Sequence, residues 1–168
     1  AVTGHNNLEI RQIDSSRGIR EWLEVPRVVF AGDPNWIAPL NLAERQRISP
    51  RHSPFFSFGE AAFFVALRDG RPVGRISAQI DRLYLETQDA ETGFFGLIEA
   101  PDDPEVFAAL FAVAESWLKS RGMKRALGPF NLGINQEIGV LVEGFDTPPF
   151  IMMGHAPRYY DAALKAQG

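Results

Sequence analysis

The stretch from Gly93 to Glu137 constrains the fold of this chain more than any other. It begins with an apolar run, passes through Pro-Asp-Asp-Pro, continues as a helical pattern to Gly122 and returns to an apolar run before Asn131. This is the order and about the length of a βαβ unit, in which a crossover helix joins two parallel strands. The sequence therefore predicts an α/β protein built around this unit.

The helix of this unit carries clear start and stop signals. Asp103 is a candidate N-cap, and Pro104 suits the first helical position. Gly122 is placed to end the helix in a left-handed conformation. Four apolar residues recur at helical spacing, namely Val106, Leu110, Val113 and Trp117. One face of the helix is therefore expected to pack on the sheet.

An antiparallel hairpin is the next strongest signal. Two apolar runs, Ala62 to Leu67 and Val73 to Ile80, flank the tight-turn pair Asp69-Gly70. The other expected elements are a strand over Leu8 to Ile13, a helix that ends or restarts at Pro26, a short basic helix capped by Asn41, a polar loop over 81–92, a short helix over 131–142, a short strand over 150–153 and a last helix from Pro157.

Bulk composition bounds the class of protein. With 168 residues the chain is expected to form one domain, residues 1–168, with its own core. A net charge of -4 argues against nucleic acid as a partner, because phosphate binding favours a basic face. The absence of cysteine excludes thiol nucleophiles, disulfides and cysteine-based zinc sites, and the scattered histidines suggest no metal site.

Targeting signals are not evident in the sequence. No apolar run approaches the ~20 residues that a membrane span needs, and no signal-peptide pattern opens the chain. A cytoplasmic location is the expectation. The chain begins at Ala1 without a methionine, which predicts a processed protein or an excised piece.

The predicted element order is similar to that of the GNAT (acyl-CoA N-acyltransferase) fold. More specifically, the chain resembles the N-terminal half of a family of longer, uncharacterised bacterial GNAT-like proteins. The segments that carry the resemblance are 33–40 (DPNWIAPL), 69–76 (DGRPVGRI), 93–96 (GFFG), 128–131 (GPFN), 143–149 (EGFDTPP) and the ending from Tyr159. They are spread through most of the chain.

The resemblance implies a mixed central sheet flanked by helices and truncated before its last strands. A closing strand pair and a second GNAT-like half are expected after Gly168. The exposed sheet edge would favour association with another chain through strand addition, and a homodimer is one form that this association can take. The implied co-substrate is acetyl-CoA or a longer acyl-CoA, without a metal, and the implied acceptor is a small-molecule or lipid-like amine.

One turn departs from the pattern of GNAT enzymes. Their glycine-rich loop before the crossover helix holds the coenzyme A pyrophosphate through backbone N–H groups. Here that position reads Glu-Ala-Pro-Asp-Asp-Pro-Glu over 99–105. Its prolines remove N–H donors and its acids repel an anion, so no pyrophosphate is expected in this turn. The residues that bind the cofactor are unknown from the sequence.

Polar residues after the second strand of the βαβ unit are the first candidates for function. Ligands of open α/β sheets gather at the carboxyl ends of strands. Asn131 and Asn135 lie one helical turn apart and could face a common substrate. Glu137 is the candidate base that deprotonates an amine before it attacks a thioester. The alternative is that Asn131 caps a helix whose solvated face carries the other two residues.

Three residues near the end of the chain are further candidates. His155 could shuttle a proton near neutral pH, although a histidine that packs in a turn is the alternative. Tyr159 is the candidate acid that reprotonates the leaving thiolate, a role that the resemblance implies for a tyrosine in this region. Tyr160 lies one turn from Leu164 and is expected in the core.

Arg75 is a candidate ligand for a carboxylate or phosphate, with a solvated strand end as the alternative. Phenylalanines gather before and within the hairpin, namely Phe55, Phe56, Phe58, Phe63 and Phe64. They are expected in the core, and an acyl-chain channel is the alternative.

Two functions from different classes remain open. The first is an N-acyltransferase that moves an acyl group from acyl-CoA to an amine by direct attack, with a general base and a general acid. The second is a catalytically inactive GNAT-like scaffold or ligand-binding half of a larger protein. The acidic turn favours the second for this chain, whereas the resemblance favours the first for the whole protein.

Overall fold

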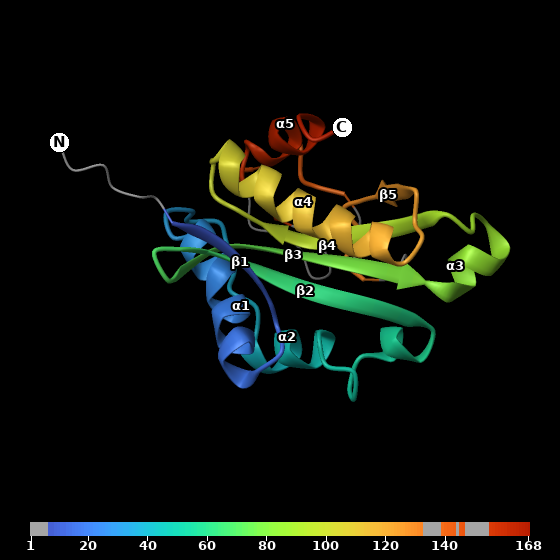
Figure 1. Cartoon of the computed structure of the whole chain (residues 1–168). Coiled ribbons are helices and arrows are strands. Elements are labelled where there is room, and N and C mark those ends of the chain that lie inside the picture. The colour runs from blue at the N-terminus through green and yellow to red at the C-terminus, as the bar shows by residue number, and fades with distance from the viewer. Residues whose placement is uncertain (1–6, 133–138, 144, 147–154) are drawn as a thin grey trace.

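The computed structural model describes residues 7–132, 139–143, 145–146 and 155–168 (Figure 1). In chain order the elements are β1 (Leu8–Gln12), α1 (Ser16–Val29), α2 (Asn41–Arg47), the 3-10 turn η1 (Pro54–Ser57), β2 (Gly59–Arg68), β3 (Arg71–Asp81), α3 (Arg82–Thr87), β4 (Thr92–Glu99), α4 (Pro104–Ser120), β5 (Arg125–Leu127) and α5 (Tyr160–Lys165).

A five-stranded mixed sheet forms the middle layer, in the order β1-β2-β3-β4-β5. Strands β1 to β4 pair with one another in antiparallel fashion, whereas β5 pairs with β4 in parallel. Helices α1 and α2 cover one face, while α4 and α5 cover the other (Figure 1). The predicted α/β class, with helices on a mixed sheet, is confirmed.

The two strongest sequence signals form the elements that they predict. Asp69 and Gly70 both have positive φ, 51° and 78°, as a tight hairpin turn between β2 and β3 requires. In the βαβ unit the Asp103 side chain accepts a hydrogen bond from the Glu105 N–H, and Pro104 is the first residue of α4. Gly122 follows the helix with φ 81°.

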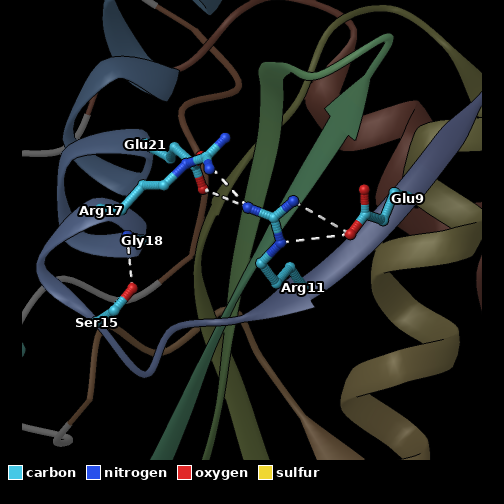
Figure 2. Close-up of polar contacts among 6 residues, drawn as sticks. All are labelled: Glu9, Arg11, Ser15, Arg17, Gly18 and Glu21. Carbon is cyan, nitrogen blue, oxygen red and sulfur yellow. Dashed lines mark hydrogen bonds and ion pairs between the residues drawn. The ribbon is translucent and has the colours of Figure 1, made fainter.

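Helix α1 starts at a serine cap and is held to β1 by ion pairs. The Ser15 hydroxyl accepts from the Gly18 N–H at 3.3 Å. Arg11 of β1 lies between Glu9 and Glu21, with Nη1 3.3 Å from Glu21 Oε2, and Arg17 adds a second cation to Glu21 (Figure 2). These contacts fix the start of α1 on the edge strand.

The prediction that the first helix ends or restarts at Pro26 is wrong, because α1 runs through it to Val29. A proline inside a helix has no N–H for the carbonyl four residues earlier. That carbonyl belongs to Trp22, and it accepts a hydrogen bond at 3.3 Å from Nη1 of Arg75 instead. The guanidinium group thus replaces the hydrogen bond that the proline removes.

Other boundaries also differ from the sequence prediction. The expected loop over 81–92 contains α3, whose N-cap Asp81 accepts from the Tyr84 N–H. Asn41 is the first residue of α2 rather than its cap, and α5 starts at Tyr160 rather than at Pro157. Of the expected helix over 131–142, the described residues 131–132 and 139–142 are not helical. The expected strand over 150–153 lies outside the described residues.

Two apolar layers make the core. On the α4 side, Ile76 and Ala78 of β3 are fully buried beneath Leu110 and Phe107. On the α1 side, Trp22 is fully buried and its ring meets Phe63 edge-on at 5.3 Å. Of the phenylalanines in question, Phe55, Phe63 and Phe64 are buried, and Phe56 and Phe58 pack against the same core. The core expectation for this group is confirmed.

Candidate functional site

Strand β4 is distorted near its carboxyl end, where the candidate site lies. Leu97 has φ 46°, and the pairing of β3 with β4 shifts between Arg75 and Ser77. An irregularity of this kind bends a strand and re-aims its side chains, and it is frequent next to functional sites. The Leu97 N–H points away from the ladder and donates at 2.9 Å to Oδ1 of Asn131.

The segment after β5 crosses over this distortion. The Phe130 N–H donates to the Phe95 carbonyl at 2.8 Å, and the Phe130 carbonyl lies directly over Gly96. A Cβ at Gly96 would be only 1.7 Å from the Phe130 oxygen, so a side chain cannot fit there. Glycine at this position therefore lets the segment that carries Asn131 press onto β4.

A buried polar row of β3 holds the same segment from below. The Ser77 hydroxyl donates to Gln79 Oε1 at 2.9 Å, and both side chains are fully buried. Gln79 Nε2 donates to the carbonyls of Phe130 at 2.6 Å and Leu132 at 3.5 Å. Sequence reasoning missed these residues. The signal for them is the alternation of Arg75, Ser77 and Gln79 within an otherwise apolar strand.

Arg75 belongs to the same row and is inside the protein, with 4% of its surface exposed. Its guanidinium lies 4.7 Å from the Trp22 ring centroid, and Nη2 lies 3.8 Å from Glu44 Oε2. Burial lowers the pKa of Arg75, while the charges of Glu99 and Glu44 oppose that shift. The alternative of a solvated strand end is wrong for Arg75, and its role in substrate binding stays a prediction.

Glu99, the last residue of β4, meets the two adjacent tyrosines. Tyr160 is 2% exposed; its hydroxyl donates to Glu99 Oε2 at 2.6 Å and accepts from the Ala100 N–H at 2.9 Å. The expectation that Tyr160 packs in the core is confirmed. Sequence reasoning missed Glu99, because nothing in the sequence brings it next to a tyrosine 61 residues away.

Tyr159 is only partly buried, as suits a candidate acid. Its hydroxyl donates to the Ala100 carbonyl at 2.6 Å. Burial, helped by the charges of Asp102 and Glu99, raises the pKa of Tyr159 to about 12. The phenol therefore keeps its proton at neutral pH and is chemically able to donate it.

His155 forms a pair with Asp33, a residue that the sequence indicated only within the segment 33–40 that carries the family resemblance. The His155 Nε2 and Asp33 Oδ2 atoms are 2.7 Å apart, and 4% of the imidazole is exposed. Nδ1 is buried and has no hydrogen-bond partner among the residues that the structure describes. Burial raises the pKa of Asp33, but hydrogen bonds from His155 and the Asn35 N–H outweigh it and lower the pKa below its usual value.

The N-terminus of α4 already holds anions of the protein itself. Asp103 caps the helix, and Arg68 Nη2 lies 2.7 Å from Asp103 Oδ2 and 3.3 Å from Glu105 Oε2. The positive end of the helix is thus covered by carboxylates that carry their own counter-ion. This arrangement accords with the expectation that no pyrophosphate binds in the turn.

A groove of about 360 Å³ lies between α4, β5 and α5. Its apolar lining comes mainly from Phe95, Phe111, Leu118, Leu127 and Leu164, and its rim carries Glu115, Asp161 and Lys165. It runs beside β5, whose three residues are exposed. Across residues 7–132, 139–143, 145–146 and 155–168, no cluster of three or more acidic or histidine side chains could hold a metal ion.

The structure brings some of the predicted site residues together and leaves others undescribed. Tyr159 and Tyr160 meet the end of β4, and Asn131 lies at its distortion. Asn135 and Glu137 lie outside the described residues. Their roles stay predictions.

The chain is similar to two curated proteins along almost its full length, and it matches no known family in a scan of family profiles. It is 45% identical over 163 residues to the bacterial ceramide synthase of Caulobacter vibrioides, a match that covers 96% of this chain and 42% of that protein. It is 43% identical over 159 residues to Protein YghO of Escherichia coli, covering 95% and 40%. The chain thus spans less than half the length of these relatives.

Solved structures share the chain path at low sequence identity. Aminoglycoside N-acetyltransferase AAC(6')-Iy in complex with CoA has a TM-score of 0.57 at 17% identity, over 99% of this chain and 89% of that one. A tandem GNAT protein from the clavulanic acid biosynthesis pathway has a TM-score of 0.55 at 16% identity, over 70% and 34%. With its five-stranded mixed sheet and its βαβ unit, the chain has a GNAT-like fold.

Proposed function

We propose that this chain is part of an N-acyltransferase that moves an acyl group from an acyl-CoA to the amino group of a long-chain, lipid-like amine. The observation that carries the proposal is the 45% identity to a bacterial ceramide synthase along 96% of the chain. A ceramide is the amide of a long-chain amino alcohol and a fatty acid. The GNAT-like fold is compatible with such an acyl transfer, although fold alone does not define a reaction.

The proposed reaction is direct attack without a covalent enzyme intermediate. The amine nitrogen attacks the thioester carbonyl, a C–N bond forms and the C–S bond breaks. Glu137 takes the proton from the attacking nitrogen, directly or through water, and Tyr159 gives its proton to the departing coenzyme A thiolate. Tyr159 is protonated at neutral pH and so has a proton to give, while its raised pKa, about 12, makes it a weaker acid than a free tyrosine.

His155 is the second proposed proton carrier. When Nε2–H donates to Asp33, the neutral imidazole carries its lone pair on Nδ1, the nitrogen that has no hydrogen-bond partner within the described part of the chain. Asn135 is proposed to bind the acceptor. Asn131 and Arg75 are the other two proposed substrate contacts, and both also have structural partners, Leu97 for the first and Trp22 for the second.

A scaffold without catalytic activity is the second candidate for this chain. Two observations favour it. The first is that Asp103 and Arg68 cover the N-terminus of α4. The second is that the carbonyl of Phe130, in the segment after β5, lies against Gly96 of β4. On this hypothesis another part of the longer protein binds the acyl-CoA, and this half supports it.

The test is N-acylation of a long-chain amine by the full-length protein, followed by mass spectrometry of the amide. The variants Glu137→Gln and Tyr159→Phe should each lower kcat by about 10²-fold or more, the usual size of a general acid or base effect. Tyr84→Phe is the matched control, because Tyr84 lies on α3, where its ring packs against Phe94. Unchanged turnover in Glu137→Gln removes Glu137 as the base.

A further inference from the structure

The connection from α1 to α2 exposes large apolar side chains among arginines. Ile37, Leu40 and Leu42 are 61%, 77% and 67% exposed. Apolar side chains gathered at this level of exposure mark an interaction site more often than chance surface composition does. Leu40 is the N-cap residue of α2 and Leu42 lies in its first turn, so both exposed leucines belong to the start of this helix.

Basic side chains surround these apolar residues. Arg27 at the end of α1 donates to Asn41 Oδ1 at 3.0 Å, which ties the two helices together beside Leu40. Arg45 lies one turn after Leu42 on α2, and Arg51 follows the helix; both are exposed. We call Ile37, Leu40, Leu42, Arg27, Arg45 and Arg51 the apolar-basic surface.

The charge of this surface is opposite to that of the whole chain. Between residues 27 and 52 the acids are Asp33 and Glu44, and neither side chain is more than 27% exposed. Asp33 pairs with His155, and Glu44 is 6% exposed and pairs with Arg47. The exposed formal charges of this stretch are therefore all arginines, in a chain with a net charge of -4.

We propose that the apolar-basic surface docks onto an anionic lipid bilayer. Leucine and isoleucine side chains enter the boundary between head groups and acyl chains, while guanidinium groups meet lipid phosphates. None of the helices that the structure describes is long and apolar enough to cross a bilayer. The contact proposed here lies in the plane of the membrane surface.

The same connection reaches the candidate site. Asp33 holds His155, and the Trp36 ring stacks on Phe30 at 5.3 Å, which in turn lies 5.8 Å from the His155 ring. Ile37, the first apolar residue of the apolar-basic surface, directly follows Trp36 in the chain. If the proposed function holds, on which this step rests, docking places the site where a long-chain amine can enter from the bilayer.

The experiment is co-sedimentation of the full-length protein with vesicles of phosphatidylcholine, with and without phosphatidylglycerol. The wild type should bind the anionic vesicles, and added salt should weaken binding by screening the arginines. The double variant Leu40→Gln/Leu42→Gln should lose binding. Arg45→Gln/Arg51→Gln should weaken it by about 30-fold, the effect of two basic charges near an anionic surface.

Matched control variants distinguish binding through this surface from nonspecific binding of the protein to vesicles. Leu83→Gln removes a leucine that is 55% exposed on α3, and Arg71→Gln removes an exposed arginine at the β2–β3 turn; neither should change binding. The proposal is overturned if the wild type stays in solution with anionic vesicles or if the controls weaken binding equally. It is also overturned if the leucine variant changes the protein's mass in solution without any vesicle binding, because the surface is then a protein interface.

Vesicle binding is measured without turnover, so its result is independent of the proposed function. N-acylation in detergent micelles, where no bilayer is needed, should be the same in the wild type and in Leu40→Gln/Leu42→Gln. Vesicle binding without N-acylation in any variant keeps the docking surface and removes the proposed function. N-acylation without vesicle binding keeps the proposed function and removes the docking surface.

Discussion

Gly96 shows how one residue decides the geometry of the candidate site. Its lack of a side chain lets the Phe130 carbonyl lie on β4, and this places Asn131 next to the Leu97 N–H. The sequence indicates Gly96 only as part of an apolar strand. The need for glycine there arises from a backbone 34 residues later in the chain, which local sequence patterns do not contain.

Gly96→Ala should lower the free energy of unfolding by about 3 kcal/mol, the upper end of the usual cost of overpacking, because the new Cβ meets backbone rather than a flexible side chain. Urea denaturation measures this change. Gly32→Ala is the matched control, since a Cβ there meets nothing within 4 Å. Equal stability of the two variants would mean that the Phe130 segment does not press on β4.

At the scale of elements, the βαβ unit illustrates what local signals predict well. The cap at Asp103, the proline after it, the apolar spacing of α4 and Gly122 lie within one helix and agree with one another. Helix α1 illustrates the opposite. Its interior Pro26 costs about 3 kcal/mol by itself, and the compensating donor is Arg75 on a distant strand. Local signals therefore predict a break where tertiary contacts continue the helix.

Neighbouring acids before α4 allow a sharp test of the cap. Asp103→Ala should lower the free energy of unfolding by about 1 kcal/mol or more, because the Glu105 N–H loses its acceptor and Arg68 loses one of its two carboxylate partners. Asp102→Ala, which removes the exposed acid beside it, should change it by less than about 0.5 kcal/mol. Thermal or urea unfolding of both variants gives the comparison, and similar losses would assign the effect to charge rather than to the cap.

At the scale of the whole molecule, the proposed function requires an acyl-CoA site, and the N-terminus of α4 bears on where it lies. The curated relatives are more than twice as long as the chain. The second GNAT-like half expected from the resemblance stays a prediction. The acids at the N-terminus of α4 are evident from the sequence. The structure adds that Arg68 forms ion pairs with two of them, Asp103 and Glu105. The expectation that no pyrophosphate binds at this helix end stays a prediction.

Thermal unfolding of this chain and of the full-length protein, each with an acyl-CoA, resolves the matter. A ligand at 100 times its Kd stabilises its binding partner by about 2.7 kcal/mol. We expect the full-length protein to be stabilised and this chain alone to be unchanged. Stabilisation of this chain by acyl-CoA would contradict our interpretation of the α4 N-terminus. No shift in either protein would favour the scaffold hypothesis.

The sequence by itself determined the α/β class, the hairpin, the βαβ unit and the burial of Tyr160, because periodicity, caps and turn residues act over a few positions. Only the tertiary structure decided that Arg75 is buried, that Glu99 meets Tyr160 and that Asp33 holds His155. These pairs join residues far apart in the chain. Their hydrogen bonds form because packing of the two layers on the sheet brings the groups together and excludes water, and no local pattern encodes that meeting.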